Sequence, residues 1–156
     1  MKLYHYTSIH HIPLIIDHGS LWKGDIPLTN SLRYGQEGNA VWLTTCEFAN
    51  PSDHGLGNPV CDKSEIRFTI EVDEDDPRLF KWSDYARLNN VEPSWYKRLD
   101  EVSGGSADTW WLFISPIRIA GLEVARKIDG RYIQLENNVA TLPGGETCQS
   151  SVQNSM

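Results

Sequence analysis

The chain has 156 residues, of which 40% are hydrophobic and 22% are charged, so it can bury a core as one domain without a covalent or metal staple. No apolar run approaches the roughly 20 residues that cross a bilayer, which excludes a membrane-spanning helix. The net charge of −7 disfavours broad binding to nucleic acid, because such binding depends on Lys and Arg displacing counterions from phosphates.

The first element in the chain is a strand that leads directly into a helix. Residues 2–7 alternate in strand fashion. Ser8 can cap a helix over residues 9–17, Pro13 is tolerated in its first turn, and Gly19 suits its C-terminal end. The sequence therefore predicts a strand, a helix and a glycine stop.

The middle of the chain predicts a loop, two strands and a helical region. Residues 24–38 form a long loop, and the β-branched and aromatic residues 41–45 form a short strand. Residues 65–72 alternate between apolar and polar side chains, as a half-buried strand does. Residues 82–102 are helical, with an interruption near Pro93.

The last third of the chain predicts a strand and a hairpin. The strand covers residues 110–114, and the hairpin pairs residues 130–135 with residues 138–142. We therefore expect a single α+β domain over residues 1–143, with a split mixed or antiparallel sheet and flanking helices. A polar, flexible tail over residues 144–156 follows.

Compartment and metal content are also addressed by the sequence. The chain starts with a strand-like pattern instead of a basic segment followed by an apolar one, so we expect a cytoplasmic protein. The three cysteines are odd in number and lack the spacing of zinc sites, so we expect reduced thiols. The adjacent histidines His10 and His11 diverge by about 100° on a helix, so we expect no metal there.

The densest group of chemically capable residues lies in the first strand. The period of two places His5 and Thr7 on one face, and Tyr4 and Tyr6 on the other. A neutral imidazole can hydrogen-bond a ribose hydroxyl, and adjoining main-chain groups can pair with a carboxamide. A strand histidine is also commonly structural, so this pattern needs its context.

That context resembles a known superfamily. A strand with His-x-Thr precedes a helix that ends in His18-Gly19-Ser20-Leu21, and a loop then leads to Val41-Trp42-Leu43-Thr44-Thr45. This arrangement resembles the amino-terminal half of ADP-ribosyltransferases of the diphtheria-toxin, poly-ADP-ribose polymerase and DNA-modifying DarT type. The likeness covers residues 2–72 well and the rest loosely.

The resemblance implies a fold and an NAD site. It implies that His5 holds the nicotinamide ribose, that the main chain of Tyr6 pairs with the nicotinamide amide, and that Trp42 stacks on the nicotinamide ring. Such a site suits cleavage of the N-glycosidic bond, because a held ribose and a stacked leaving group favour the transition state.

The superfamily also places a glutamate on a late strand, where it stabilises the developing positive charge and orients the acceptor. Here the best-aligned acid is Asp108, at the start of the strand over residues 110–114. Glu123 and Glu136 are the other candidates. Since aspartate reaches one methylene less far, Asp108 requires a closer approach of its backbone.

Other side chains suit the same ligand but also have structural explanations. Thr44 and Thr45 can bond phosphate or ribose oxygens, and Thr7 lies beside His5 as a further cofactor-binding candidate. Arg33 can meet the pyrophosphate, and His54 can close one wall of the cleft. Strand and loop chemistry explain these residues equally well. The aromatic residues later in the chain fit a core better than a base-stacking platform, namely Trp82, Trp95, Trp110, Trp111 and Phe113.

Together these features indicate a mono-ADP-ribosyltransferase that moves ADP-ribose from NAD, without a metal, to a macromolecule, with protein favoured over nucleic acid. A toxin, a phage-encoded modifier and a regulator all fit this description. Two alternatives stay open. One is a catalytically inactive relative that inhibits a partner through the acidic residues between Glu71 and Asp76, and the other is an NAD glycohydrolase. The acceptor and the oligomeric state are not indicated by the sequence.

Overall fold

A computed structural model provides the structure of the chain, and it describes residues 1–22, 24–25, 39–49, 61–91, 93–102 and 105–136. Arg33, His54 and the predicted tail over residues 144–156 lie outside the described residues. The described part of the chain contains no helix that is both long and apolar enough to cross a membrane.

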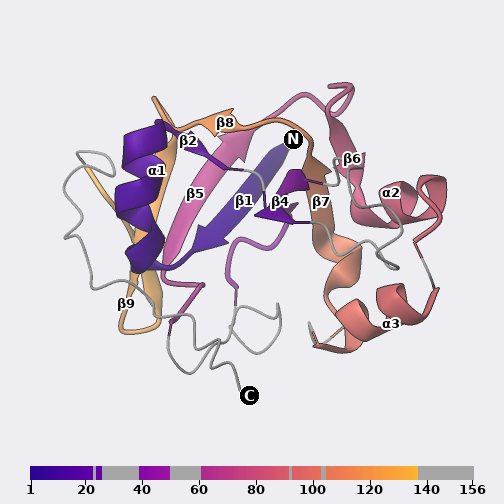
Figure 1. Ribbon diagram of the computed structural model, residues 1–156. Coiled ribbons are helices and arrows are strands. Elements are labelled where there is room, and N and C mark those ends of the chain that lie inside the picture. The colour runs from indigo at the N-terminus through magenta and orange to yellow at the C-terminus, as the bar shows by residue number, and fades with distance from the viewer. Residues whose placement is uncertain (23, 26–38, 50–60, 92, 103–104, 137–156) are drawn as a thin grey trace, which may run out of the picture.

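The described strands build one antiparallel sheet of eight strands in the order β10-β9-β5-β1-β4-β7-β6, with β3 paired to β4 (Figure 1). Its strands are β1 (Lys2–Thr7), β3 (Gly24–Asp25), β4 (Asn39–Thr44), β5 (Ile66–Glu71), β6 (Leu79–Lys81), β7 (Trp110–Phe113), β9 (Glu123–Ile128) and β10 (Arg131–Gln134). A separate two-stranded sheet pairs β2 (Ser20–Leu21) with β8 (Ile117–Arg118).

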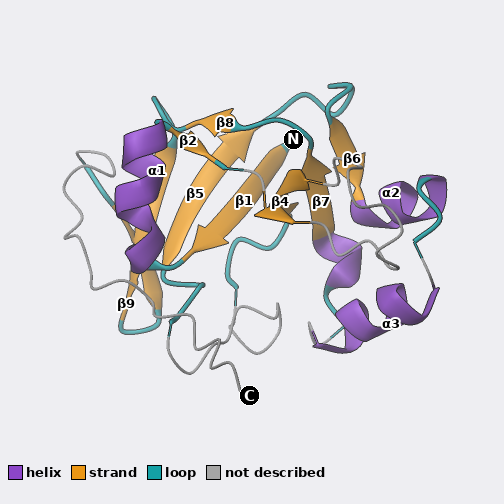
Figure 2. Ribbon diagram, in the orientation of Figure 1, coloured by secondary structure: helices purple, strands orange, loops and turns teal. Residues whose placement is uncertain are grey.

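The described ranges also contain three α-helices and two short 3₁₀ turns. The helices are α1 (Ile12–His18), α2 (Trp82–Leu88) and α3 (Pro93–Val102), and the 3₁₀ turns are η1 (Ile9–His11) and η2 (Ala107–Thr109). Figure 2 shows α1 at one end of the sheet and the pair α2 and α3 at the other. This is the α+β organisation that the sequence predicts.

The helix predicted over residues 9–17 is a 3₁₀ turn, η1, followed by the α-helix α1, and this helical segment lies between Ser8 and Gly19 as the sequence indicates. The Ser8 hydroxyl accepts a hydrogen bond from the main-chain N–H of His10 at 3.2 Å. Pro13 occupies the first turn of α1. Gly19 ends the helix with a φ of 66°, a left-handed conformation that side chains other than glycine adopt at a cost.

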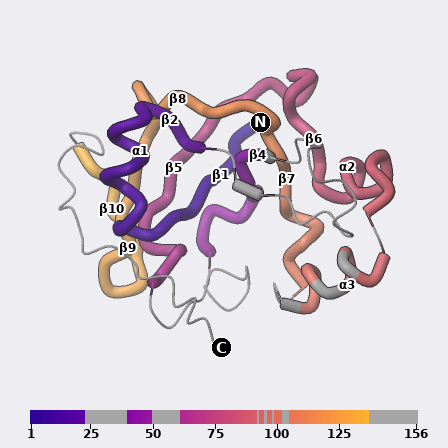
Figure 3. Tube along the Cα trace, viewed as in Figure 1, coloured from indigo at the N-terminus to yellow at the C-terminus, as the bar shows by residue number. Residues whose placement is uncertain are grey.

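One face of the sheet packs against α1, and we call it the α1 face. Leu3 of β1 and Phe68 of β5 are both fully buried there, together with Ile12 of the helix. Strands β1 and β5 lie side by side in the trace although they are far apart in sequence (Figure 3), and His5 pairs with Phe68. Since directly paired residues share a face, His5 lies on the α1 face.

The opposite face packs against α2, and we call it the α2 face. Its core contains Ala40 of β4, Leu112 of β7 and Trp82 of α2, each with 0% exposure. Further along this face, Tyr4 and Tyr6 of β1 form a small cluster with Ala49. The alternation predicted for β1 is therefore present, with His5 and Thr7 on the α1 face.

The described chain ends in a hairpin that the sequence did not predict. Residues 131–134 do form a strand, but their partner is β9, which precedes them, and residues 138–142 lie outside the described residues. The turn consists of Asp129 and Gly130, whose φ values are 51° and 75°. Two residues with positive φ match the twist of flanking strands, which explains why the hairpin closes there.

One cysteine also differs from the expectation. Cys46 is a free thiol, whereas Cys61 is disulfide-bonded. The expectation of reduced thiols is therefore wrong for Cys61.

Candidate functional site

The His5 imidazole is held by the strand next to its own. Its Nδ1 lies 2.9 Å from the main-chain oxygen of Trp42 on β4. A carbonyl oxygen only accepts hydrogen bonds, so His5 donates through Nδ1–H and its neutral tautomer leaves Nε2 as an acceptor. Burial lowers the pKa of His5 below its usual 6.5, which favours this neutral form.

The second ring nitrogen of His5 is available for binding. Among the described residues, no hydrogen bond is made by Nε2, and the side chain is only partly buried. The edge of the ring approaches Phe68, with 6.3 Å between the ring centroids. His5 therefore presents one oriented acceptor beside an apolar surface, and this arrangement suits a hydroxyl donor such as that of a ribose.

Thr7 and His11 form a second polar pair on the same side of the sheet. The Thr7 hydroxyl lies 2.9 Å from Nδ1 of His11, four residues later in the chain. Thr7 is buried and His11 is exposed. The pKa of His11 is lowered by burial of part of its ring, by Lys63 and by His10.

These two pairs are close enough to interact electrostatically. A positive charge on His11 contributes to lowering the pKa of His5. The sequence singled out His5 and Thr7 but not His11 as a site residue. The cap at Ser8 is the sequence signal that could have indicated His11. The turn that begins at Ser8 brings His11 back beside the end of β1.

Tyr6 is placed away from this cluster. Its ring lies on the α2 face, its hydroxyl donates to the main-chain oxygen of Cys46 at 2.7 Å, and its ring contacts Tyr132 at 5.8 Å. Burial raises the pKa of the Tyr6 hydroxyl. The role implied for Tyr6 concerns its main chain, which lies in the β1–β5 ladder opposite Arg67.

Trp42 does not share a face with His5. Its indole lies on the α2 face, 5.1 Å from the Trp82 ring and 5.3 Å from the Trp110 ring between centroids. Thr44 lies on the same face, and its hydroxyl is 2.9 Å from that of Thr109. A ligand held by the His5 imidazole on the α1 face therefore cannot also stack on the Trp42 indole.

The acid candidates also lie apart from His5. Asp108 is an exposed residue of η2, and its charge raises the pKa of Tyr96 on α3, so it is near the helices of the α2 face. Glu123 pairs with Thr69 and is exposed, and Glu136 is exposed near the end of the described chain. Within the described residues, no hydrogen bond or ion pair joins His5 to a carboxylate.

The site that the structure assembles is therefore smaller than the predicted one. It contains the side chains of His5, Thr7 and His11, which we call the His5–Thr7–His11 cluster. His5 offers this cluster an acceptor for a hydroxyl group, and the cluster lacks the stacking partner predicted for the nicotinamide. Among the described residues, no group of three or more His, Cys, Asp or Glu side chains is arranged to hold a metal ion.

Comparisons with known proteins leave the family open, since no family model, curated protein or solved structure matches the chain.

Proposed function

We propose that the chain binds NAD at the His5–Thr7–His11 cluster and acts on it as an ADP-ribosyltransferase or, with water as the acceptor, as an NAD glycohydrolase. The observation that carries the proposal is the fixed orientation of His5. Its Nδ1–H bond to the Trp42 carbonyl at 2.9 Å leaves Nε2 as an acceptor for a ribose hydroxyl. The His-x-Thr pattern of β1 and the resemblance over residues 2–72 supply the identity of the ligand.

The ligand fits the residues in part. A hydroxyl donor fits His5, while the indole of Trp42 faces the other side of the sheet and does not contribute stacking to a ligand there. We therefore assign to Trp42 only its main-chain oxygen, which orients the imidazole. We assign no catalytic role to Asp108, because it lies near Tyr96 on the α2 face.

The test is incubation of the purified chain with NAD carrying a label on its adenylate, with and without a cell lysate, together with measurement of released nicotinamide. We expect nicotinamide release, and labelled macromolecules if the acceptor is a macromolecule. His5→Asn keeps a donor near the position of Nδ1 but removes Nε2, so this variant should release little nicotinamide. If the wild type neither binds NAD nor releases nicotinamide, the proposal is wrong.

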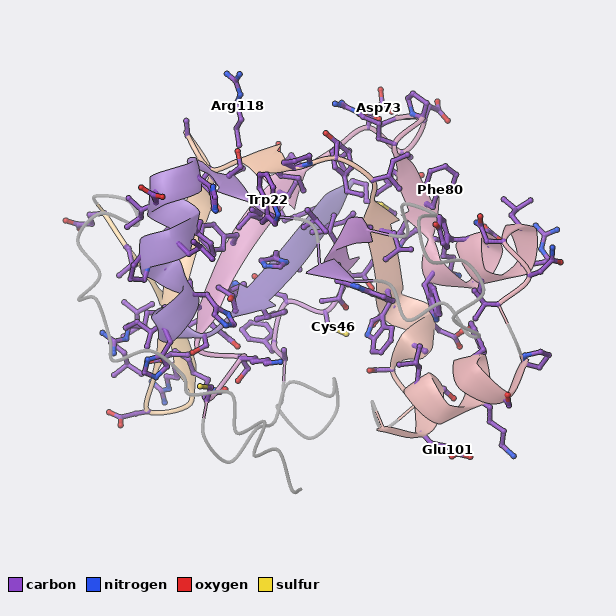
Figure 4. The ribbon with its side chains drawn as sticks, viewed as in Figure 1. Trp22, Cys46, Asp73, Phe80, Glu101 and Arg118 are labelled. Atoms are coloured by element: carbon purple, nitrogen blue, oxygen red, sulfur yellow. The ribbon has the colours of Figure 1, made fainter. Side chains whose placement is uncertain are left out.

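A second candidate is a binding protein without turnover. It is favoured by the separation of His5 from Asp108 and by the exposed acidic turn after β5 (Figure 4 labels Asp73). Part of this turn has a local role, since Asp76 forms an ion pair with Arg78 at 2.8 Å. If the chain is a binding protein, replacing Asp73, Glu74 and Asp75 with the corresponding amides should abolish binding to its partner. If the chain acts on NAD, the same replacement should leave NAD turnover unchanged.

A further inference from the structure

His11 is the second imidazole of the His5–Thr7–His11 cluster. Its Nδ1 is engaged by the Thr7 hydroxyl at 2.9 Å, so its ring is oriented by a buried residue of β1. The side chain is otherwise exposed, and a charge on it is felt at His5. Among the described residues, its other ring nitrogen makes no hydrogen bond, and an imidazole held at one nitrogen in this way has the arrangement of a general base.

The chemistry that the proposed function requires defines what this base would do. When the bond between nicotinamide and the ribose carbon breaks, the electron pair leaves with nicotinamide. The acceptor hydroxyl or water then forms a new bond to that carbon and must lose a proton. Within the described residues, His5 has no hydrogen bond or ion pair to a carboxylate, whereas a charge on His11 acts on it.

We infer that His11 is the general base of this site, held in position by Thr7, and that its Nε2 takes the proton of the attacking hydroxyl or water. This inference rests on the proposed function. The proton balance closes because the protonated His11 returns its proton to solvent after each turnover. His5 binds the ribose and His11 acts on the acceptor, so the two imidazoles have separate roles.

The surroundings of His11 support a neutral imidazole at physiological pH. Burial of part of the ring, Lys63 and His10 lower the pKa of His11 below the ordinary value of 6.5, and His5 is the other titratable group that interacts with it. A base works in its neutral form. Its activity should therefore be present above this lowered pKa and be lost as the pH falls through it.

The key variant is His11→Asn, which keeps a hydrogen-bonding group near Nδ1 for Thr7 but has no base at the position of Nε2. We expect nicotinamide release to fall about a hundredfold or more, which is the usual contribution of a general base. The dissociation constant for NAD, measured by calorimetry, should change by less than about threefold, because His5 is untouched. His18→Asn is the matched control, since His18 is an exposed histidine of α1 that stacks on Trp22, and it should behave as the wild type.

A second readout does not depend on turnover. We expect the imidazole NMR signals of His11 in the wild type to titrate below pH 6.5 and to shift when NAD is added. Thr7→Val removes the hydroxyl while keeping the shape of the side chain, so it should slow nicotinamide release about tenfold and leave the affinity for NAD unchanged. A thermal unfolding curve for each variant separates these effects from loss of the fold.

The outcomes distinguish this inference from the proposed function. If His11→Asn releases nicotinamide within about threefold of wild type while His5→Asn loses NAD binding, His11 is not the base and the NAD site stands. If the wild type binds NAD without releasing nicotinamide, the inference is also overturned, and the chain is a binding protein. If the wild type does not bind NAD, the proposed function fails, and the role of His11 fails with it.

Discussion

Substitution of Trp42 separates the structural role of this residue from the ligand-stacking role that the resemblance implies. The indole forms two aromatic pairs, with Trp82 and Trp110, on the face opposite His5. Each pair is worth about 0.5–1.5 kcal/mol beyond the buried area, and truncating a buried Trp to Ala costs about 3–5 kcal/mol. Because Trp42 is partly exposed, we expect Trp42→Ala to lower the free energy of unfolding by about 3 kcal/mol.

The assay compares urea unfolding with calorimetric titration of NAD, and Trp42→Phe serves as a milder variant that keeps an aromatic ring. We expect Trp42→Phe to cost about 1 kcal/mol of stability and to change the dissociation constant for NAD by less than about threefold. A folded Trp42→Phe protein with unchanged stability and NAD affinity reduced about tenfold would refute the reasoning. That result would place the indole against the ligand.

Three further predictions concern the acid candidate, the helix stop and the response to alkali. Asp108→Asn should release nicotinamide at a rate within about threefold of the wild-type rate, because Asp108 lies away from His5. A loss of rate of about a hundredfold would identify Asp108 as the catalytic acid. Gly19→Ala should lower the free energy of unfolding by about 1–2 kcal/mol, because alanine is strained at a φ of 66°. An unchanged midpoint temperature of thermal unfolding would contradict that strain. Burial raises the pKa of Tyr132 to about 12, and it also raises the pKa of Tyr6. Because both hydroxyls stay protonated longer in the folded state than in the unfolded state, their contribution to stability is complete below pH 10 and is lost as the pH rises from 10 through 12. Urea unfolding at stepped pH should show a shallower alkaline loss in Tyr132→Phe, and equal slopes in variant and wild type would contradict the assignment.

Local signals predicted much of the fold. Strand β5 follows from strict alternation between Ile66 and Glu71, and the helix between Ser8 and Gly19 follows from its two caps. Both signals are contained in a few consecutive residues. Such elements depend little on the rest of the chain, so a single sequence suffices to place them.

The hairpin of β9 and β10 was missed for a local reason. Its turn is Asp129-Gly130, a pair that favours the two-residue turns of hairpins, whereas the sequence prediction considered only the residues that follow 130–135 as a partner. Strand β9 itself has an arginine, Arg126, among its alternating apolar positions, which weakens its pattern.

The relation between His5 and Trp42 could not be read from either strand alone. Alternation within β1 fixes which residues share a face with His5, and alternation within β4 does the same for Trp42. Which face of β4 aligns with which face of β1 depends on the register between them, and a shift of one residue exchanges the faces. The register pairs Tyr4 with Thr44, and this places the Trp42 side chain with the tyrosines and away from His5.

The contact between His11 and Thr7 depends on the geometry of the turn that follows β1. The sequence showed His11 as half of a histidine pair on a helix. The structure instead places it against the Thr7 hydroxyl, because η1 folds back over the end of β1. A side chain that packs on the preceding strand requires the turn geometry, which propensity does not supply.

The central claim is that Nε2 of His5 binds NAD, and calorimetric titration of NAD into the wild type and His5→Asn tests it most directly. The account predicts measurable binding by the wild type and a loss of affinity of about tenfold or more in His5→Asn, with unchanged thermal unfolding. Equal affinity of the two proteins, or no binding by the wild type, would contradict it.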